Sequence, residues 1–171
     1  GSAEAGCVEA IENLISMCEN GEGVPRDYHK AAEWREKLIS ELKQRYEQLP
    51  CFNNAKLLIS AMSGLGRAYY DLLDQEHSVA IYREMITLAE KFDADYPGEW
   101  FLKMQVFGYH DLAYAVKGQV RVEEQTPGKI LSLDIIGFIE CHYKALKTAE
   151  KLNEKTKNDS QARLILAMSY Y

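Results

Sequence analysis

A glycine-rich turn between two amphipathic segments constrains the fold of this chain more than any other feature. Gly21 and Gly23 can take the positive φ that a sharp reversal needs, and Pro25 keeps the residue before it extended. Asp27 is a good helix N-cap, with helix-forming residues directly behind it. Residues 20–37 are therefore predicted to close one helix and start the next, as in a helical hairpin.

Helical periodicity continues along most of the chain, because apolar residues recur at three- and four-residue steps. Pro50, Pro97 and a non-helical segment at 118–129 interrupt the pattern. Nothing requires a strand, so the sequence predicts an all-α chain of about seven helices, with short loops that make neighbouring helices antiparallel. The predicted helices span residues 7–19, 27–48, 54–73, 77–95, 99–117 and 131–155, and a last one from 158 to the end.

Three of the predicted helices share a motif, in which a large residue and a small one are followed by a large residue one turn later. The motif occurs as Leu65-Gly66 with Tyr69, as Leu112-Ala113 with Val116, and as Leu166-Ala167 with Tyr170. The small residue lets two helices approach, and the later side chain fills the gap beside the contact. One hairpin cannot bury its own apolar face, so the hairpins are expected to stack.

This recurrence resembles tetratricopeptide repeats with unusually long helices. Gly66, Tyr69 and Tyr82 stand at positions that the family favours, whereas Ser78 replaces its usual alanine. The resemblance implies a right-handed superhelical α-solenoid of stacked antiparallel helix hairpins. Residues 51–171 would form these hairpins, the last of them truncated by the end of the chain.

The opening stretch resembles a Sel-one-like repeat, a relative of the tetratricopeptide repeat with a glycine-rich inner turn. The pattern that carries the resemblance is Gly21-x-Gly23-Val24-x-x-Asp27-Tyr28-x-Lys30-Ala31-x-x-Trp34-x-x-Lys37. Ile15 and Cys18 depart from it, since they replace the family's usual glycine and tyrosine. The resemblance implies one hairpin at residues 1–50, joined to residues 51–171 in one continuous solenoid.

Composition and charge argue against several functional classes. The formal net charge of −6 disfavours a nucleic-acid-binding protein, whose footprint is usually basic. No stretch approaches the roughly 18 uninterrupted apolar residues of a membrane span, and none has the pattern of a signal peptide. A cytoplasmic protein is therefore expected. The four cysteines form no C-x-x-C pair and are expected to be buried, reduced thiols.

No constellation of residues predicts catalysis, a cofactor or a metal. His29 and Glu33 stand one helical turn apart, which is typical of a solvated helix face. Cys141 and His142 are adjacent and so point in different directions on a helix, and no further ligand stands at metal-binding spacing. No phosphate-binding glycine loop or nucleophile elbow occurs. The chain is accordingly not expected to be an enzyme.

The concave face of the predicted stack is the remaining candidate site. In the family's geometry the opening helix of each repeat lines it, and aromatic rings with interspersed cations suit an extended or helical peptide. Several of the tyrosines equally fit a packing role between helices. The predicted partner-binding residues are Ser63, Arg67, Tyr70, His110, Tyr114, Lys117, Met168 and Tyr171.

We therefore expect a protein–protein interaction scaffold that binds a peptide or protein segment in the concave groove, without catalysis. One alternative is the repeat or sensor region of a larger regulatory or signalling protein, whose activity lies outside these 171 residues. Another is a structural array that self-associates through its truncated ends. In each case the partner is a protein or peptide, and neither nucleic acid nor a membrane is expected.

Overall fold

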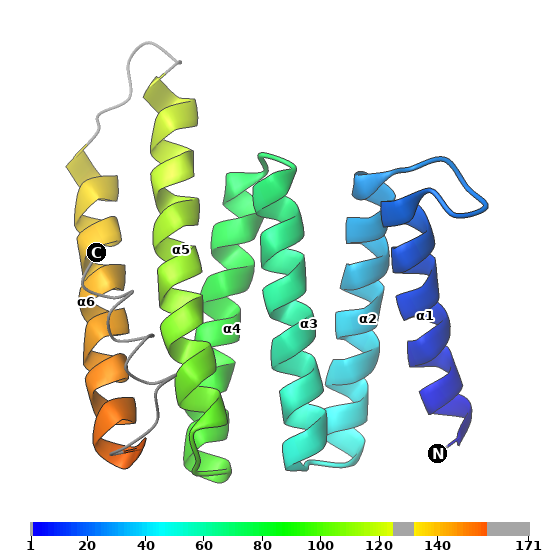
Figure 1. The fold of residues 1–171 in the computed structure, drawn as a ribbon, viewed down its shortest axis with the longest axis horizontal. Helices are drawn as coiled ribbons and strands as arrows, with labels where there is room; N and C mark the ends of the chain where they lie inside the picture. Colours follow the sequence, from blue (N-terminus) through cyan, green and yellow to red (C-terminus); the bar gives the residue numbers. More distant parts are fainter. Residues whose placement is uncertain (1, 125–131, 157–171) are drawn as a thin grey trace. The chain divides into compact units, whose positions relative to one another are not determined.

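The computed structural model describes residues 2–124 and 132–156, which form six α-helices and no strand. The helices are α1 (Ser2–Asn20), α2 (Tyr28–Gln48), α3 (Phe52–Asp71), α4 (Gln75–Asp95), α5 (Trp100–Glu124) and α6 (Ser132–Thr156) (Figure 1). The predicted all-α class is confirmed, but the described residues hold six helices instead of about seven. The predicted seventh helix, with Met168 and Tyr171, lies outside the described residues.

Helix α5 is longer than the sequence predicts. The segment at 118–129 is expected to be irregular, yet α5 continues to Glu124. Glutamine, arginine and glutamate are good helix formers, and no proline occurs before Pro127. A single glycine, Gly118, is tolerated inside a helix at a cost of about 1 kcal/mol relative to alanine. Val120 and Val122, which alternate with polar residues in the sequence, therefore belong to helix α5 and not to an extended segment.

The chain divides into two compact units, and each is described by itself. Unit 1 is Gly1–Asp74 with α1–α3, and unit 2 is Gln75–Tyr171 with α4–α6. Within each unit consecutive helices run antiparallel (Figure 1). In unit 1, α2 packs against both α1 and α3, and in unit 2, α5 packs against both α4 and α6. Among the described residues the backbones of the two outer helices of a unit stay apart, so the middle helix holds each unit together.

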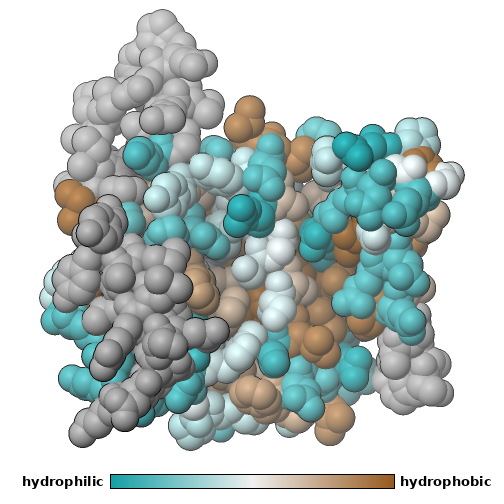
Figure 2. All heavy atoms as spheres, in the orientation of Figure 1, coloured by the Kyte–Doolittle hydropathy of each residue, from teal (hydrophilic) through white to brown (hydrophobic). Residues whose placement is uncertain are grey.

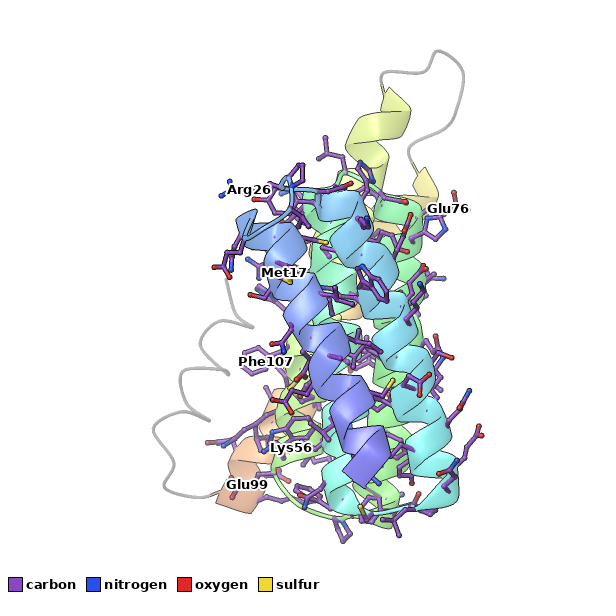
Figure 3. All side chains as sticks on the ribbon, turned by 90° about the vertical axis from the view of Figure 1, so that its right-hand side faces the viewer. Met17, Arg26, Lys56, Glu76, Glu99 and Phe107 are labelled. Carbon is purple, nitrogen blue, oxygen red and sulfur yellow. The ribbon has the colours of Figure 1, made fainter. Side chains whose placement is uncertain are left out.

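The turn between α1 and α2 has the geometry that the sequence predicts. Gly21 and Gly23 both have φ of +76°, in the left-handed region that glycine adopts without strain. Asp27 caps α2, because its Oδ1 accepts a hydrogen bond from the backbone N–H of Lys30 at 3.0 Å. Figure 3 shows Arg26 and Met17 at this end of unit 1. The predicted end of one helix and start of the next are therefore confirmed.

One side chain of α2 reaches both neighbouring helices of unit 1. The guanidinium of Arg35 donates to Glu19 Oε1 on α1, at 2.8 Å from Nη2 and 3.2 Å from Nε. On the other side it lies against α3, where a Cβ added at Gly64 would come within 2.8 Å of Nη1. The mid-helix glycine therefore makes room for this arginine. The apolar stripe of α2 packs beneath it, with Leu38 and Leu42 buried.

Unit 2 has a core on each of two faces of α5. Towards α4, the rings of Phe92 and Phe101 lie 5.6 Å apart. Towards α6, a separate buried cluster is made of Leu102, Val106, Ala149 and Leu152. Burying such side chains fully stabilises a fold by about 1.5–3 kcal/mol each. The two cores together fix α5 between its neighbours.

The four cysteines are free thiols, as expected, but only Cys18 is buried. Cys7 is exposed, and Cys51 and Cys141 are half-buried. In the part of the chain that the structure describes, no helix combines the length and apolar character that crossing a membrane requires.

The crossing of α4 and α5 depends on Gly108. A Cβ at this position would lie 2.5 Å from Met85 Cε and 2.8 Å from Ile86 Cγ1, both on α4. We predict that Gly108→Ala lowers the free energy of unfolding by about 1–3 kcal/mol, because an overpacked core must shift to admit the methyl group. Urea denaturation followed by circular dichroism measures this change.

Gly137 on α6 provides the matched control. A Cβ there would lie 3.9 Å from Val116 Cγ1, an ordinary contact distance. Gly137→Ala is expected to leave stability unchanged or raise it by up to about 1 kcal/mol, through helix propensity alone. If both substitutions have the same effect, the close approach at Gly108 is not what limits this position.

Candidate functional site

An open groove of about 760 Å³ lies over α5, between α4 and α6. The groove arises because α4 and α6 pack on different faces of α5. At 3.6 residues per turn, Gly108 faces α4, while Leu102 and Val106 face α6. Tyr109 and Leu112 lie between those two faces and form the floor. The walls are Arg83, Ile86, Thr87 and Glu90 on α4, and Gly137, Glu140, Cys141, Tyr143, Lys144, Lys147 and Thr148 on α6.

The floor of the groove is organised by a hydrogen bond between α5 and α4. The hydroxyl of Tyr109 donates to Glu90 Oε1 at 2.7 Å, and the tyrosine is 9% exposed. Burial, followed by this bond to a carboxylate, raises the pKa of Tyr109 above its ordinary value. The phenol is therefore neutral at physiological pH, and it holds the Glu90 carboxylate in place.

The α6 wall presents cations beside aromatic rings. Lys144 Nζ lies 5.9 Å from the centroid of the Tyr109 ring, and Lys147 Nζ lies 5.7 Å from that of Tyr143. Lys147 also approaches Glu150, at 3.4 Å. The Tyr143 side chain is largely exposed, at 60%. An exposed tyrosine beside an ammonium group offers both contact area and hydrogen-bond donors to a bound segment.

The thiol of Cys141 lines the groove but is not activated. Burial is the largest influence and raises its pKa, although the positive charges of Arg83 and Lys144 oppose this. A thiol with a raised pKa is a poor nucleophile at neutral pH. Among the described residues, no group of three or more His, Cys, Asp or Glu is placed to hold a metal ion.

Unit 1 has a smaller groove in the equivalent position, over α2 and between α1 and α3. Its volume is about 340 Å³. The lining is mainly apolar, and Figure 2 shows apolar surface reaching the solvent over α1–α3 between hydrophilic borders. The lining residues are Val8, Glu12, Ile15, Ser16, Glu19, Arg35, Leu38, Leu42, Leu57, Ser60 and Ala61. The one basic residue of this lining, Arg35, is paired with Glu19. This groove therefore has fewer charged groups to contact a ligand than the groove of unit 2.

The predicted residues on α5 come together, but outside the groove. The rings of His110 and Tyr114 lie 4.8 Å apart, and those of His110 and His142 lie 6.1 Å apart. Lys117 is exposed. Burial, then the charges of His110 and Lys117, lowers the pKa of His142. We name this cluster of His110, Tyr114, Lys117 and His142 the outer face of unit 2.

The three predicted residues on α3 belong to unit 1. Arg67 is exposed, whereas Ser63 and Tyr70 are half-buried. None of them lines the unit 1 groove.

The side chains on the α6 wall of the unit 2 groove are not among the residues predicted from the sequence. Tyr143, Lys144 and Lys147 lie on the polar side of the predicted helix at 131–155 and have the pattern of an ordinary solvated face. The available signal is the spacing of a tyrosine and two lysines over one turn of that helix. Recognising it as a wall requires knowing that α4 and α6 pack on different faces of α5.

Comparison with known proteins gives a fold but no family. No protein-family model matches the sequence, and no curated protein is significantly similar to it. Among solved structures, the chain is similar to one described as "DHF79 filament", with a TM-score of 0.52 and 12% sequence identity. The match covers 99% of this chain and 85% of that one. At this level of identity the likeness shows a shared helical architecture only.

The Tyr109–Glu90 bond makes a prediction about stability at alkaline pH. The pKa of Tyr109 is raised on folding, so its contribution is present in full below the unfolded value of about 10. That contribution is lost as the pH rises through the folded-state pKa. We expect Tyr109→Phe to cost about 1 kcal/mol near neutral pH. Urea unfolding of wild type and variant across the alkaline range should show this difference shrinking above pH about 10.

Tyr143→Phe is the control for this measurement, because that phenol is exposed in the same groove. It should change the free energy of unfolding little at any pH. A Tyr109→Phe variant whose stability difference from wild type is constant across the alkaline range would show that the bond does not stabilise the fold.

Proposed function

We propose that this chain is a protein–protein interaction module that binds a peptide or protein segment in the groove of unit 2. The observation that carries the proposal is the open groove between α4 and α6. Its floor of Tyr109 and Leu112 offers apolar contact, and its walls offer exposed donors and aromatic rings. Tyrosine and arginine are the residue types that dominate binding energy at protein interfaces.

The form of the groove favours a polypeptide segment over a small molecule. Small-molecule sites are concave and bury most of the ligand's surface among apolar side chains. This groove is open to solvent, and charged or hydroxyl-bearing side chains supply most of its walls. A helix or extended segment lying between α4 and α6 would contact both walls at once.

We infer a right-handed, tetratricopeptide-like solenoid that begins with a Sel-one-like hairpin. The left-handed Gly21 and Gly23 and the Asp27 cap support the hairpin assignment, because they are the features on which that turn pattern depends. The antiparallel order of the helices within each unit supports the repeat assignment (Figure 1).

The outer face of unit 2 is the competing surface, and a matched pair of variants separates it from the groove. Tyr143 and Tyr114 are both exposed tyrosines, at 60% and 44%, on the groove wall and the outer face respectively. Peptides would be selected from a displayed library on the full chain, and their affinities measured by isothermal titration calorimetry. We predict that Tyr143→Ala weakens binding about tenfold, as expected for an aromatic anchor, and that Tyr114→Ala changes it little.

The opposite result, loss with Tyr114→Ala alone, would move the site to the outer face. A library that yields no peptide for the wild-type chain would contradict the proposed function.

A further inference from the structure

We propose that the groove of unit 2 selects an acidic segment of a partner protein, an inference that rests on the proposed function and specifies its ligand. The proposal follows from the charges that line the groove, their arrangement on both walls and the apolar floor between them.

More basic than acidic side chains line the groove, although the chain as a whole is acidic. Three basic side chains line it, Arg83 on α4 and Lys144 and Lys147 on α6, against two acidic ones, Glu90 and Glu140. Lys147 is also paired with Glu150, at 3.4 Å. The chain as a whole has a formal net charge of −6. Glu90 is also the acceptor of the Tyr109 hydroxyl, so its carboxylate is already engaged within the groove. A carboxylate-bearing segment therefore meets more cations than carboxylates in this groove, in a chain whose net charge is negative.

The cations are positioned on two walls. Lys144 lies near the Tyr109 ring and Lys147 near the Tyr143 ring, within the distance at which a cation and an aromatic ring attract each other. Arg83 is on the opposite wall, close enough to act electrostatically on the Cys141 thiol of α6. A segment lying along the groove would thus find donors for carboxylates on both sides. The floor of Leu112 and Tyr109 adds a place for an aliphatic or aromatic side chain.

Nucleic acid fits these features less well than an acidic peptide. Its backbone carries a charge at every nucleotide, and binding it depends on an extended basic surface. Three cations in a chain of net charge −6 do not supply one. The floor of Tyr109 and Leu112 suits contact with an apolar side chain of a polypeptide.

The test uses three labelled peptides of equal length with a common spacing of leucine and tyrosine. Their remaining positions are all glutamate, all glutamine or all lysine. Fluorescence anisotropy with the full chain at low salt should show the glutamate peptide binding about tenfold more tightly than the glutamine peptide, and the lysine peptide more weakly than either. Added salt should reduce the preference, since exposed charges are screened.

Paired charge reversals locate the effect. The double variant Lys144→Glu, Lys147→Glu should lose about tenfold in affinity for the glutamate peptide. The control Lys91→Glu, Lys155→Glu changes the net charge equally, at exposed positions of unit 2 outside the groove lining, and should lose much less. Equal loss in both double variants would overturn the proposal.

Two further outcomes separate this inference from the proposed function. Equal binding of the glutamate and glutamine peptides, weakened in both cases by Tyr143→Ala, would overturn acidic selectivity and leave the groove as a peptide site. Binding of neither peptide would also overturn the inference, while peptides from the displayed library would still decide the proposed function. A single-stranded oligonucleotide that displaces the glutamate peptide at lower concentration than the unlabelled peptide does would overturn the assigned partner class.

Discussion

The packing of α5 against two helices whose backbones do not approach each other determines the form of unit 2. Gly108 brings α4 close on one face, and the cluster of Leu102 and Val106 with residues of α6 holds the other. The outer helices are bridged by the Asp93–Lys151 ion pair at 3.4 Å. Because apolar packing covers two faces of α5, the side chains of Tyr109 and Leu112 between those faces line the floor of a groove. The candidate site is thus a consequence of how the unit is held together.

Unit 1 repeats the same arrangement with different chemistry. Arg35 on the middle helix reaches Glu19 on α1 and lies against Gly64 on α3, so one guanidinium contacts all three helices. That arginine is consumed by an internal ion pair and its groove is mainly apolar. In unit 2 the cations lie on the groove walls beside tyrosine rings. The two units therefore share a helical architecture but differ in the side chains that line their grooves, with one cation in unit 1 and three in unit 2.

Local features of the fold could be predicted from the sequence, whereas the site could not. The φ values of Gly21 and Gly23 and the Asp27 cap depend on neighbouring residues alone, so the sequence analysis identified them. The end of α5 was mispredicted, because Gly118 and the nearby Pro127 suggested a loop, whereas the helix continues to Glu124. The groove depends on which faces of α5 are covered by α4 and α6. The helical periodicity of the sequence does not determine this, because it depends on tertiary packing. Tyr143 and its neighbouring lysines therefore had the pattern of an ordinary solvated helix surface.

The central claim is that a protein segment binds between α4 and α6. Nuclear magnetic resonance of the isotope-labelled chain, titrated with a peptide selected on it, tests this most directly. We expect the largest backbone amide shifts on residues of both walls and the floor, including Thr87, Leu112 and Thr148. Shifts concentrated at His110 and Tyr114, or confined to α1–α3, would contradict it.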